Sequence, residues 1–497
     1  MERAAWLRSF GLGRDPFDAR DARHDEVLAL EPLGMLHVHF AVVHGATEVP
    51  HSCLIEGVPG SGRTALCMQL VAEDEHDALH RPGLGRRVVP IDRFAEVARG
   101  VEERRGGSIT ACEAIDLVLH RVVPEIVDEV LGIANDGTRP RMPVTDAAAA
   151  IESAGPAVCR DLLVLQALYD RDEGAPSRTM LLRDRFALSG GVLAESSRSW
   201  GLVLLGSSVV IGIVLVALGE RRDAALLRAL PSVAPEWAQA LPWIGLGLLL
   251  SASLGLLGRW AVAGLYSRSR VRRAMRSIVV TDRDAEDLST CLNEWRPVDL
   301  RRVPRRGAIA PRLELLDRLE RIVRLLGWRS IAVVVDGVDD DAITRRAIKA
   351  LLDERIVQRS GTSVVLAAPP SAVVDLRVPC SRVTLDWPVP ALRRLIQSRM
   401  DRCADRPAAA PSFDALFEPA ISRAEIDGWL AHWATPKAAL AAMHRLIAAH
   451  TDSPMRLQPM LDAEDEPQAL PPTAQPLTRA TLERVLGRPR LTHPGCA

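Results

Sequence analysis

Two long stretches without a charged residue constrain this fold more than any other feature of the chain. The first runs for 20 residues from Trp200 to Gly219, and the second runs for 22 residues from Trp237 to Gly258. As a helix, each stretch is long enough to cross ~30 Å of hydrocarbon. Tryptophans near the segment ends are typical of membrane interfaces. The sequence therefore predicts a two-helix transmembrane hairpin over residues 200–258, and a pair of buried core helices is the alternative.

The arginines around these segments predict the orientation of the hairpin. Nine arginines flank the two segments, and only three lie in the loop between them. The flanking set is Arg183, Arg185, Arg198, Arg259, Arg268, Arg270, Arg272, Arg273 and Arg276, and the loop set is Arg221, Arg222 and Arg228. Because positively charged flanks stay on the cytoplasmic side, we expect a multi-pass protein of the bacterial inner (cytoplasmic) membrane with both termini in the cytoplasm.

Composition excludes one class of protein, and charge argues against another. Apolar residues make up 48% and charged residues 25% of the 497 residues, which is the composition of a globular protein and excludes a disordered chain. The 62 basic and 63 acidic residues give a net charge of -1. The chain therefore lacks the excess of cations that displaces counterions from nucleic acid, and no nucleic-acid partner is expected. Only two residues are lysine, Lys349 and Lys437, which fits the coding bias of a GC-rich bacterium.

A glycine-rich segment follows a short apolar run near the start of the chain. Residues 51–56 are expected to form a buried strand, and the residues after Thr64 are expected to form a helix. The segment between them has the P-loop pattern of strand, glycine-rich loop and helix, in which successive N–H groups face a phosphate. Its candidate phosphate-binding residues are Gly57, Gly60, Ser61, Gly62, Arg63 and Thr64. Arg63 stands where P-loops carry lysine, and the Thr64 hydroxyl is a candidate ligand of Mg²⁺.

A carboxylate follows a second buried strand much later in the chain. The apolar residues 331–335 predict a central parallel strand, and Asp336 comes directly after it. Open α/β sheets bind ligands at the carboxyl ends of their strands, so Asp336 is expected to hold Mg²⁺ through water. Asp339 or Asp340 is expected to orient or deprotonate the attacking water. Further strands are expected at residues 87–91, 363–367 and 382–386, which would complete a five-stranded parallel sheet.

The two motifs together resemble an AAA+/STAND-like bacterial P-loop NTPase. The hairpin between them is similar to the architecture of KAP-type P-loop NTPases, and Phe10 to Phe17 (FGLGRDPF) resembles the lead-in of bacterial secretion- and transposition-type ATPases. The resemblance implies ATP and Mg²⁺ as ligands and a helical lid over the nucleotide, with Lys437 at a phosphate-sensing position. Many such ATPases place a polar γ-phosphate sensor near the position where this chain has Ala368.

These observations predict an α/β fold with several inserted segments. Its parts are an N-terminal lead-in (1–45), the first part of the P-loop NTPase core (46–107), a helical insertion (108–199), the transmembrane hairpin (200–258), the second part of the core (259–386) and a C-terminal helical lid (387–490). Within the lid, helices are expected at residues 389–403, 423–434, 436–450 and 478–487. His37 and His39 alternate as they would on one face of a strand and are interpreted as structural.

The expected function is that of a membrane-anchored ATP-binding protein, an ATP hydrolase that acts as a nucleotide-dependent switch. Its partners would be the nucleotide, the membrane, and further copies of the chain or a signalling protein. In hydrolysis, water would attack the γ-phosphate while the backbone N–H groups of residues 60–64 and Arg63 offset the developing charge. The alternative is a non-hydrolysing membrane scaffold or signalling adaptor with a degenerate P-loop. A DNA-associated ATPase is a third class, and it depends on the lead-in alone.

Overall fold

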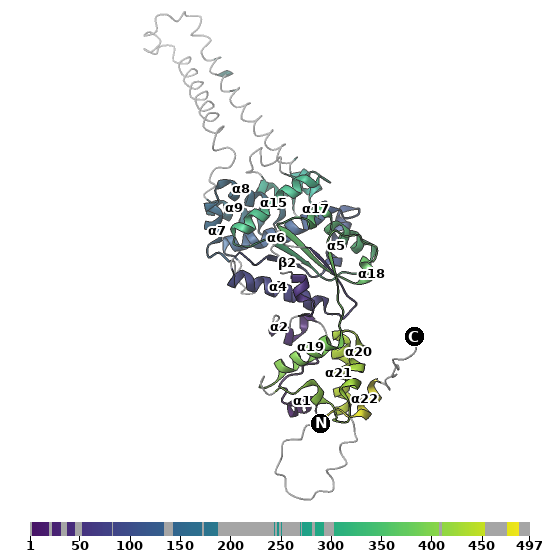
Figure 1. Ribbon diagram of the computed structural model, residues 1–497. Helices are drawn as coiled ribbons and strands as arrows, with labels where there is room; N and C mark the ends of the chain where they lie inside the picture. Colours follow the sequence, from purple (N-terminus) through teal and green to yellow (C-terminus); the bar gives the residue numbers. More distant parts are fainter. Residues whose placement is uncertain are drawn as a thin grey trace, which may run out of the picture. The chain divides into compact units, whose positions relative to one another are not determined.

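The chain forms two compact units in a computed structural model (Figure 1). The model describes residues 2–18, 22–30, 37–44, 52–81, 83–133, 143–170, 173–186, 271–280, 284–292, 303–406, 410–452 and 475–486, with positions 243, 246, 247, 250 and 269. The first unit comprises residues 1–111 and 327–497, and the second comprises residues 112–326. The predicted hairpin over 200–258 lies outside the described residues, apart from four single positions in its second segment.

The first unit is built on a five-stranded sheet in which every strand pair is parallel. The strands are β1 (Cys53–Glu56), β2 (Arg87–Ile91), β3 (Ile331–Val335), β4 (Thr362–Ala368) and β5 (Ser381–Thr384), in the order β2-β3-β4-β1-β5. All five lie where the sequence predicts them, which confirms the α/β class. Every residue of β3 and β4 is buried, as expected of central strands that are covered on both faces.

Helices of the first unit pack around this sheet. They are α3 (Phe40–His44), α4 (Arg63–His80), α5 (Phe94–Arg105), α16 (Ala342–Leu351), α17 (Glu354–Val357) and α18 (Pro370–Val373). Leu66 and Leu70 of α4 share a core with Ile55 of β1 and Val365 of β4. Because α4 follows directly from β1 through the glycine-rich segment, this packing sets the position of the segment at the carboxyl edge of the sheet.

A layer of C-terminal helices forms a second core within the first unit. The layer consists of α19 (Val389–Cys403), the 3-10 turn η4 (Phe413–Leu416), α20 (Arg423–Trp433), α21 (Pro436–Thr451) and α22 (Arg479–Leu486). All four α-helices lie where the sequence predicts helices. In Figure 1 they lie beside α1 (Arg3–Ser9), which packs against α21. Trp6, Leu12 and Phe17 of the lead-in are buried in the core of this layer, so the lead-in packs against the far end of the chain.

The second unit is helical in its described residues. Its helices are α6 (Ala111–Leu131), α7 (Ala147–Ser153), α8 (Pro156–Tyr169), α9 (Ala175–Arg185), α13 (Ala285–Leu292) and α15 (Ile309–Leu325). The fully buried Arg312 on α15 donates from Nε to both carboxylate oxygens of Asp116 on α6, at 2.9 Å each. The Tyr169 hydroxyl donates to Asp116 Oδ1 at 2.7 Å. Burial raises the pKa of Asp116 to about 6.

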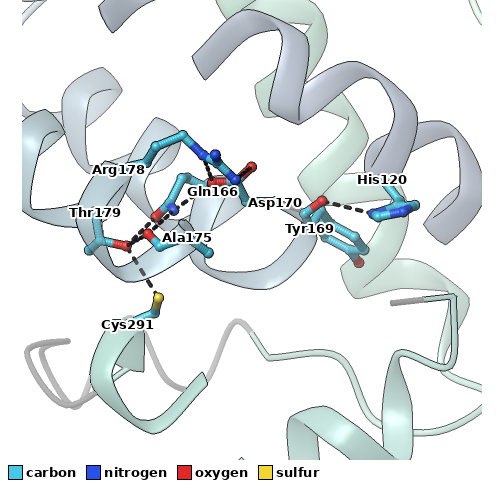
Figure 2. Close-up of polar contacts among 8 residues, drawn as sticks. All are labelled: His120, Gln166, Tyr169, Asp170, Ala175, Arg178, Thr179 and Cys291. Atoms are coloured by element: carbon cyan, nitrogen blue, oxygen red, sulfur yellow. Dashed lines mark hydrogen bonds and ion pairs between the residues drawn. The ribbon is translucent and has the colours of Figure 1, made fainter. Parts of the chain in front are cut away.

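A second polar network joins α8, α9 and α13 (Figure 2). Gln166 donates to Asp170 at 2.8 Å, and Asp170 accepts two hydrogen bonds from Arg178, at 2.8 and 2.9 Å. Thr179 donates to the Gln166 side chain at 2.8 Å and contacts Cys291 Sγ at 3.2 Å. Buried polar groups are tolerated when their hydrogen bonds are satisfied, so these side chains join helices from distant parts of the sequence.

The observed units differ from the predicted domain plan in one respect. The sequence places residues 259–326 in the second part of the core, but the helices described in this range, α13 and α15, belong to the second unit. The physical reason is that α15 packs against α7 and α8 and forms the ion pair with α6. The predicted boundary near residue 108 lies close to the observed one. Among the described residues, no helix combines the length and apolar character that a membrane crossing requires.

We predict that Asp116→Ala loosens the second unit, because it leaves the Arg312 guanidinium buried without its carboxylate. Breaking a buried ion pair in this way lowers the free energy of unfolding by about 3 kcal/mol or more. Where amides exchange through opening of the unit, their exchange rate then rises about a hundredfold. Hydrogen exchange of peptides from α6, α8 and α15 measures this rate. Glu152→Ala, at an exposed position of α7, is the matched control, and equal protection in the two variants would contradict the prediction.

Candidate functional site

The glycine-rich segment turns sharply between β1 and α4. Gly60 and Gly62 have φ angles of +86° and +90°, which L side chains rarely adopt. A Cβ at Gly60 would also lie 2.8 Å from Cβ of Lys437, so the loop backbone closely approaches the start of α21. The N-cap residue of α4, Gly62, offers no side-chain hydrogen bond to the first turn, and that turn contains no acidic residue. Such a helix start favours an anion.

Thr64 and Asp336 meet at the carboxyl edge of the sheet. The Thr64 hydroxyl donates to Asp336 Oδ2 at 2.8 Å, although the two residues are 272 positions apart in the chain. They meet because β1 and β3 are parallel and are separated only by β4, so the segments that follow them leave the sheet at the same edge. This is the juxtaposition that the sequence predicts. Their role in holding Mg²⁺ stays a prediction.

A pocket of about 300 Å³ opens beside the glycine-rich segment. The lead-in, the loop, α4 and the C-terminal helical layer all contribute to its wall. Its lining comprises Ala22, Asp25, Leu28, His37, Pro59, Gly60, Gly62, Arg63, Thr64, Ala65, Gln69, Trp387, Leu395, Arg399, Pro436, Lys437 and Leu440. Its volume lies at the lower end of the range for small-molecule sites, and it combines apolar side chains with a few polar groups. Every member of the proposed phosphate-binding set except Gly57 and Ser61 lines it.

Two cationic residues of the pocket come from opposite ends of the chain. Burial lowers the pKa of Arg63, and the nearby Asp336 carboxylate raises it. Lys437, in the first turn of α21, donates its backbone N–H to the Gly60 carbonyl at 3.3 Å. Thr435 caps the same helix by accepting from the N–H of Ala438. The sequence-predicted positions Arg63 and Lys437 therefore line one pocket, as a shared phosphate ligand would require.

A buried ion pair fixes the lead-in against this pocket. The Arg399 guanidinium on α19 contacts both carboxylate oxygens of Asp25, at 2.5 and 3.1 Å, and donates from Nε to the Pro16 carbonyl at 2.6 Å. The Asp25 carboxylate also accepts from the backbone N–H of Val27, and this hydrogen bond caps α2 (Glu26–Leu30). Sequence reasoning missed this pair, because neither residue lies in a motif and their separation of 374 positions gives no local signal.

His37 and Trp387, which both line the pocket, contact the backbone of the loop. The Trp387 indole N–H donates to the Ser61 carbonyl at 2.7 Å, and His37 Nε2 lies 3.4 Å from the same oxygen. The His37 and Trp387 rings meet edge to face at 4.6 Å. Burial lowers the pKa of His37 to about 4. The expectation of a strand at His37 and His39 was wrong, since these residues form a turn before α3.

Asp339 and Asp340 lie outside the pocket lining. Arg99 forms an ion pair with Asp339, whose side chain is 57% exposed. Arg345 forms an ion pair with Asp340, whose side chain is 39% exposed. Their predicted role in orienting water stays a prediction, and no described contact supports it. Ala368 ends β4 between the two motif strands and is fully buried, so no polar side chain stands at that strand end.

The residues of the loop and of the nearby strand end could hold a phosphate with a divalent cation. A hydroxyl and a carboxylate, Thr64 and Asp336, stand together at the loop. Ser61 Oγ is buried in the loop and has no hydrogen-bond partner among the described residues. No group of three or more His, Cys, Asp or Glu side chains gathers as a metal site in the described ranges. Mg²⁺ keeps several waters and takes substrate phosphates together with one or two protein ligands, so Thr64 and Asp336 would be the residues to hold it.

Comparisons with protein-family models, curated proteins and solved structures found no match for the chain. Three features of the site bear on function: the loop between β1 and α4, the hydrogen bond between Thr64 and Asp336, and the pocket beside them.

We predict that the His37 ring stays neutral down to about pH 4, because burial opposes its protonation. An unfolded histidine titrates near pH 6.5, so the folded state binds fewer protons between these values. The stability that neutral His37 contributes is thus complete above pH 6.5 and is lost as the pH falls toward 4. Imidazole NMR measures the titration, and His37→Gln assigns the resonance. A midpoint near 6.5 would contradict the prediction.

Proposed function

We propose that the pocket binds ATP together with Mg²⁺ and that the protein is a nucleotide-dependent switch. The single observation that carries the proposal is the hydrogen bond of 2.8 Å between Thr64 and Asp336, beside a glycine-rich loop at the carboxyl edge of a parallel sheet. This arrangement supports a phosphate chain along the loop and a divalent cation near the two oxygens. Apart from Lys437, the lining residues outside the segment from Gly60 to Thr64 would then surround the rest of the nucleotide.

Individual residues have distinct roles in this proposal. The loop N–H groups and the Arg63 guanidinium would bind phosphate oxygens, because a cation and aligned amide dipoles both attract an anion. When bound, Mg²⁺ would neutralise charge on the same oxygens. Thr64 and Asp336 would orient the ion. Leu28, Leu395 and Leu440 offer an apolar wall on which a base can pack. The absence of the guanine-specific NKxD tetrapeptide from the sequence favours ATP over GTP.

A switch follows from how the pocket is assembled. Its lining combines the lead-in, the loop above the sheet and the C-terminal helical layer. A nucleotide that contacts all three would favour one arrangement of them over others, since a ligand stabilises the state that it binds more tightly. In this proposal the C-terminal helical layer is the lid of an AAA+/STAND-like NTPase, and Lys437 is its phosphate-sensing residue.

The predicted hairpin would link the nucleotide state of the pocket to the membrane and to other proteins. Two uncharged segments of 20 and 22 residues interrupt the chain between Thr64 and Asp336, as in the KAP-type architecture that the sequence resembles. We propose that they anchor the protein in the bacterial inner membrane and that neighbouring copies or a signalling protein respond to the nucleotide state. The surplus of arginine on their flanks supports a cytoplasmic position for the pocket.

The two lysines of the chain allow a direct test of the pocket. An acyl-phosphate derivative of ATP transfers its acyl group to a lysine amine held near the phosphates. We predict that Lys437 is acylated about tenfold faster than Lys349, because a bound probe raises the local concentration at Lys437. Mass spectrometry of the full chain in detergent measures both sites, and excess ATP should suppress only the labelling at Lys437.

Lys349 is the matched control within the same molecule, since it is exposed on α16 and does not line the pocket. Arg63→Ala should reduce labelling of Lys437 about tenfold or more, because it removes a charge-assisted hydrogen bond to phosphate. Equal labelling of both lysines, unchanged by ATP, would reject a nucleotide pocket at this position.

A non-hydrolysing scaffold that binds nucleotide is the second candidate function. It is favoured by the buried Ala368 at the end of β4, where a polar side chain would otherwise face the phosphate. It is also favoured by Asp339 and Asp340, which form ion pairs with arginines outside the pocket. A loop that carries Arg63 in place of lysine agrees with either function, because arginine retains the charge but has a different shape.

A measurement of phosphate release distinguishes an ATP hydrolase from a non-hydrolysing scaffold. If the protein hydrolyses ATP, we predict that Asp336→Asn lowers the rate about a hundredfold, because it weakens the metal site that offsets charge in the transition state. Asp339→Asn tests the predicted catalytic role of Asp339: an unchanged rate would limit that residue to its ion pair with Arg99. Tight ATP binding by the wild-type protein without measurable release of phosphate would favour the scaffold.

A further inference from the structure

Arg23 contacts the acidic residue of the proposed metal site. It belongs to the 3-10 turn η1 (Ala22–His24), which lies in the lead-in. Arg23 Nη2 donates to Asp336 Oδ2 at 3.1 Å and to the Asp92 carbonyl at 3.0 Å. The neighbouring residues Ala22 and Asp25 line the pocket. A guanidinium from the lead-in therefore lies beside the carboxylate at the carboxyl edge of the sheet.

The contact uses the same oxygen that joins Asp336 to Thr64. Asp336 Oδ2 accepts from the Thr64 hydroxyl at 2.8 Å and from Arg23 at 3.1 Å. The Asp336 side chain is 10% exposed, so this carboxylate has little access to water and gains from a neighbouring cation. A divalent ion held by Thr64 and Asp336 would need the same carboxylate, and it would place a charge of +2 beside the guanidinium.

We propose that Arg23 is a built-in counter-ion that competes with the divalent cation for Asp336, so that Arg23 determines how strongly nucleotide binding depends on Mg²⁺. The inference rests on the proposed nucleotide site and deepens it. With Arg23 in place, the positive charge that the phosphates need is already supplied by Arg23 and Arg63. The added affinity from Mg²⁺ is then small, because the ion must displace a guanidinium from its carboxylate before it binds.

Arg23 is placed so that such displacement needs little rearrangement. Its side chain is 36% exposed, and its other partner, the Asp92 carboxylate, is 65% exposed at 3.8 Å. The turn that carries it is held independently, since the next residues pack through the buried pair of Asp25 and Arg399. The Arg23 side chain can therefore leave Asp336 by rotation while the lead-in stays attached to the pocket.

The affinity of a fluorescent ATP analogue, measured with excess EDTA and again with Mg²⁺, tests the inference. We predict that Mg²⁺ changes the affinity of the wild-type chain by no more than about threefold, and that it strengthens binding by Arg23→Gln about tenfold or more, because the variant frees Asp336 for the ion. Arg23→Lys keeps a cation without the planar fork and should lie between the two. Binding measured in EDTA also shows that each variant is folded.

Arg93→Gln is the matched control. Arg93 follows Asp92, its side chain is 73% exposed, and its ion pair with Glu96 does not involve Asp336, so its response to Mg²⁺ should equal that of the wild type. An equal response to Mg²⁺ in the wild type and Arg23→Gln would overturn the role of Arg23 while leaving the nucleotide site in place. Absence of binding in every protein, with or without Mg²⁺, would overturn both proposals.

Discussion

The hydrogen bond between Thr64 and Asp336 is the contact on which the rest of the site depends. It exists because a parallel sheet sends the segments after β1 and β3 to the same edge, with only β4 between these strands. The backbone of Asp336 is fixed as well: its N–H donates to the Ile91 carbonyl and its carbonyl accepts from Phe94, at 2.9 and 3.1 Å. A carboxylate anchored through β2 and β3 has little freedom, so its position relative to the loop is determined by the sheet.

The wall of the pocket depends on a different constraint, which joins the two ends of the chain. Trp6, Leu12 and Phe17 are buried among the C-terminal helices, and the Asp25–Arg399 pair closes the same interface. The lead-in therefore belongs structurally to the C-terminal helical layer as much as to the sheet. A ligand that contacts both the loop and this layer would touch elements of two cores, that of the sheet with α4 and that of the helical layer. In the proposed switch, such a ligand would couple the two cores, because a packed core changes between discrete arrangements.

The features that sequence reasoning predicted correctly all have a local signal. The five strands are short apolar runs, and β3 and β4 are rich in β-branched residues, so their positions follow from pattern alone. Thr64 and Asp336 were predicted to meet because each follows a strand. His37, Trp387 and Arg399 were missed as pocket residues, since they reach the loop only through tertiary packing. Residues 37–39 were expected in a strand because two histidines alternate, but two positions are too few to establish a period.

The charges of the pocket explain why an anion of high charge fits it better than a cation alone. Arg63, Arg399 and Lys437 line the pocket against one carboxylate, Asp25, which leaves a surplus of two positive charges. Burial already disfavours the charged form of Arg63, and a polyphosphate would relieve that penalty by supplying negative charge where water is partly excluded. A metal ion arriving without phosphate would add to the positive surplus instead. If the pocket binds nucleotide as proposed, this charge distribution favours binding of the nucleotide before the cation, which would follow once the phosphates have drawn the guanidinium groups toward themselves.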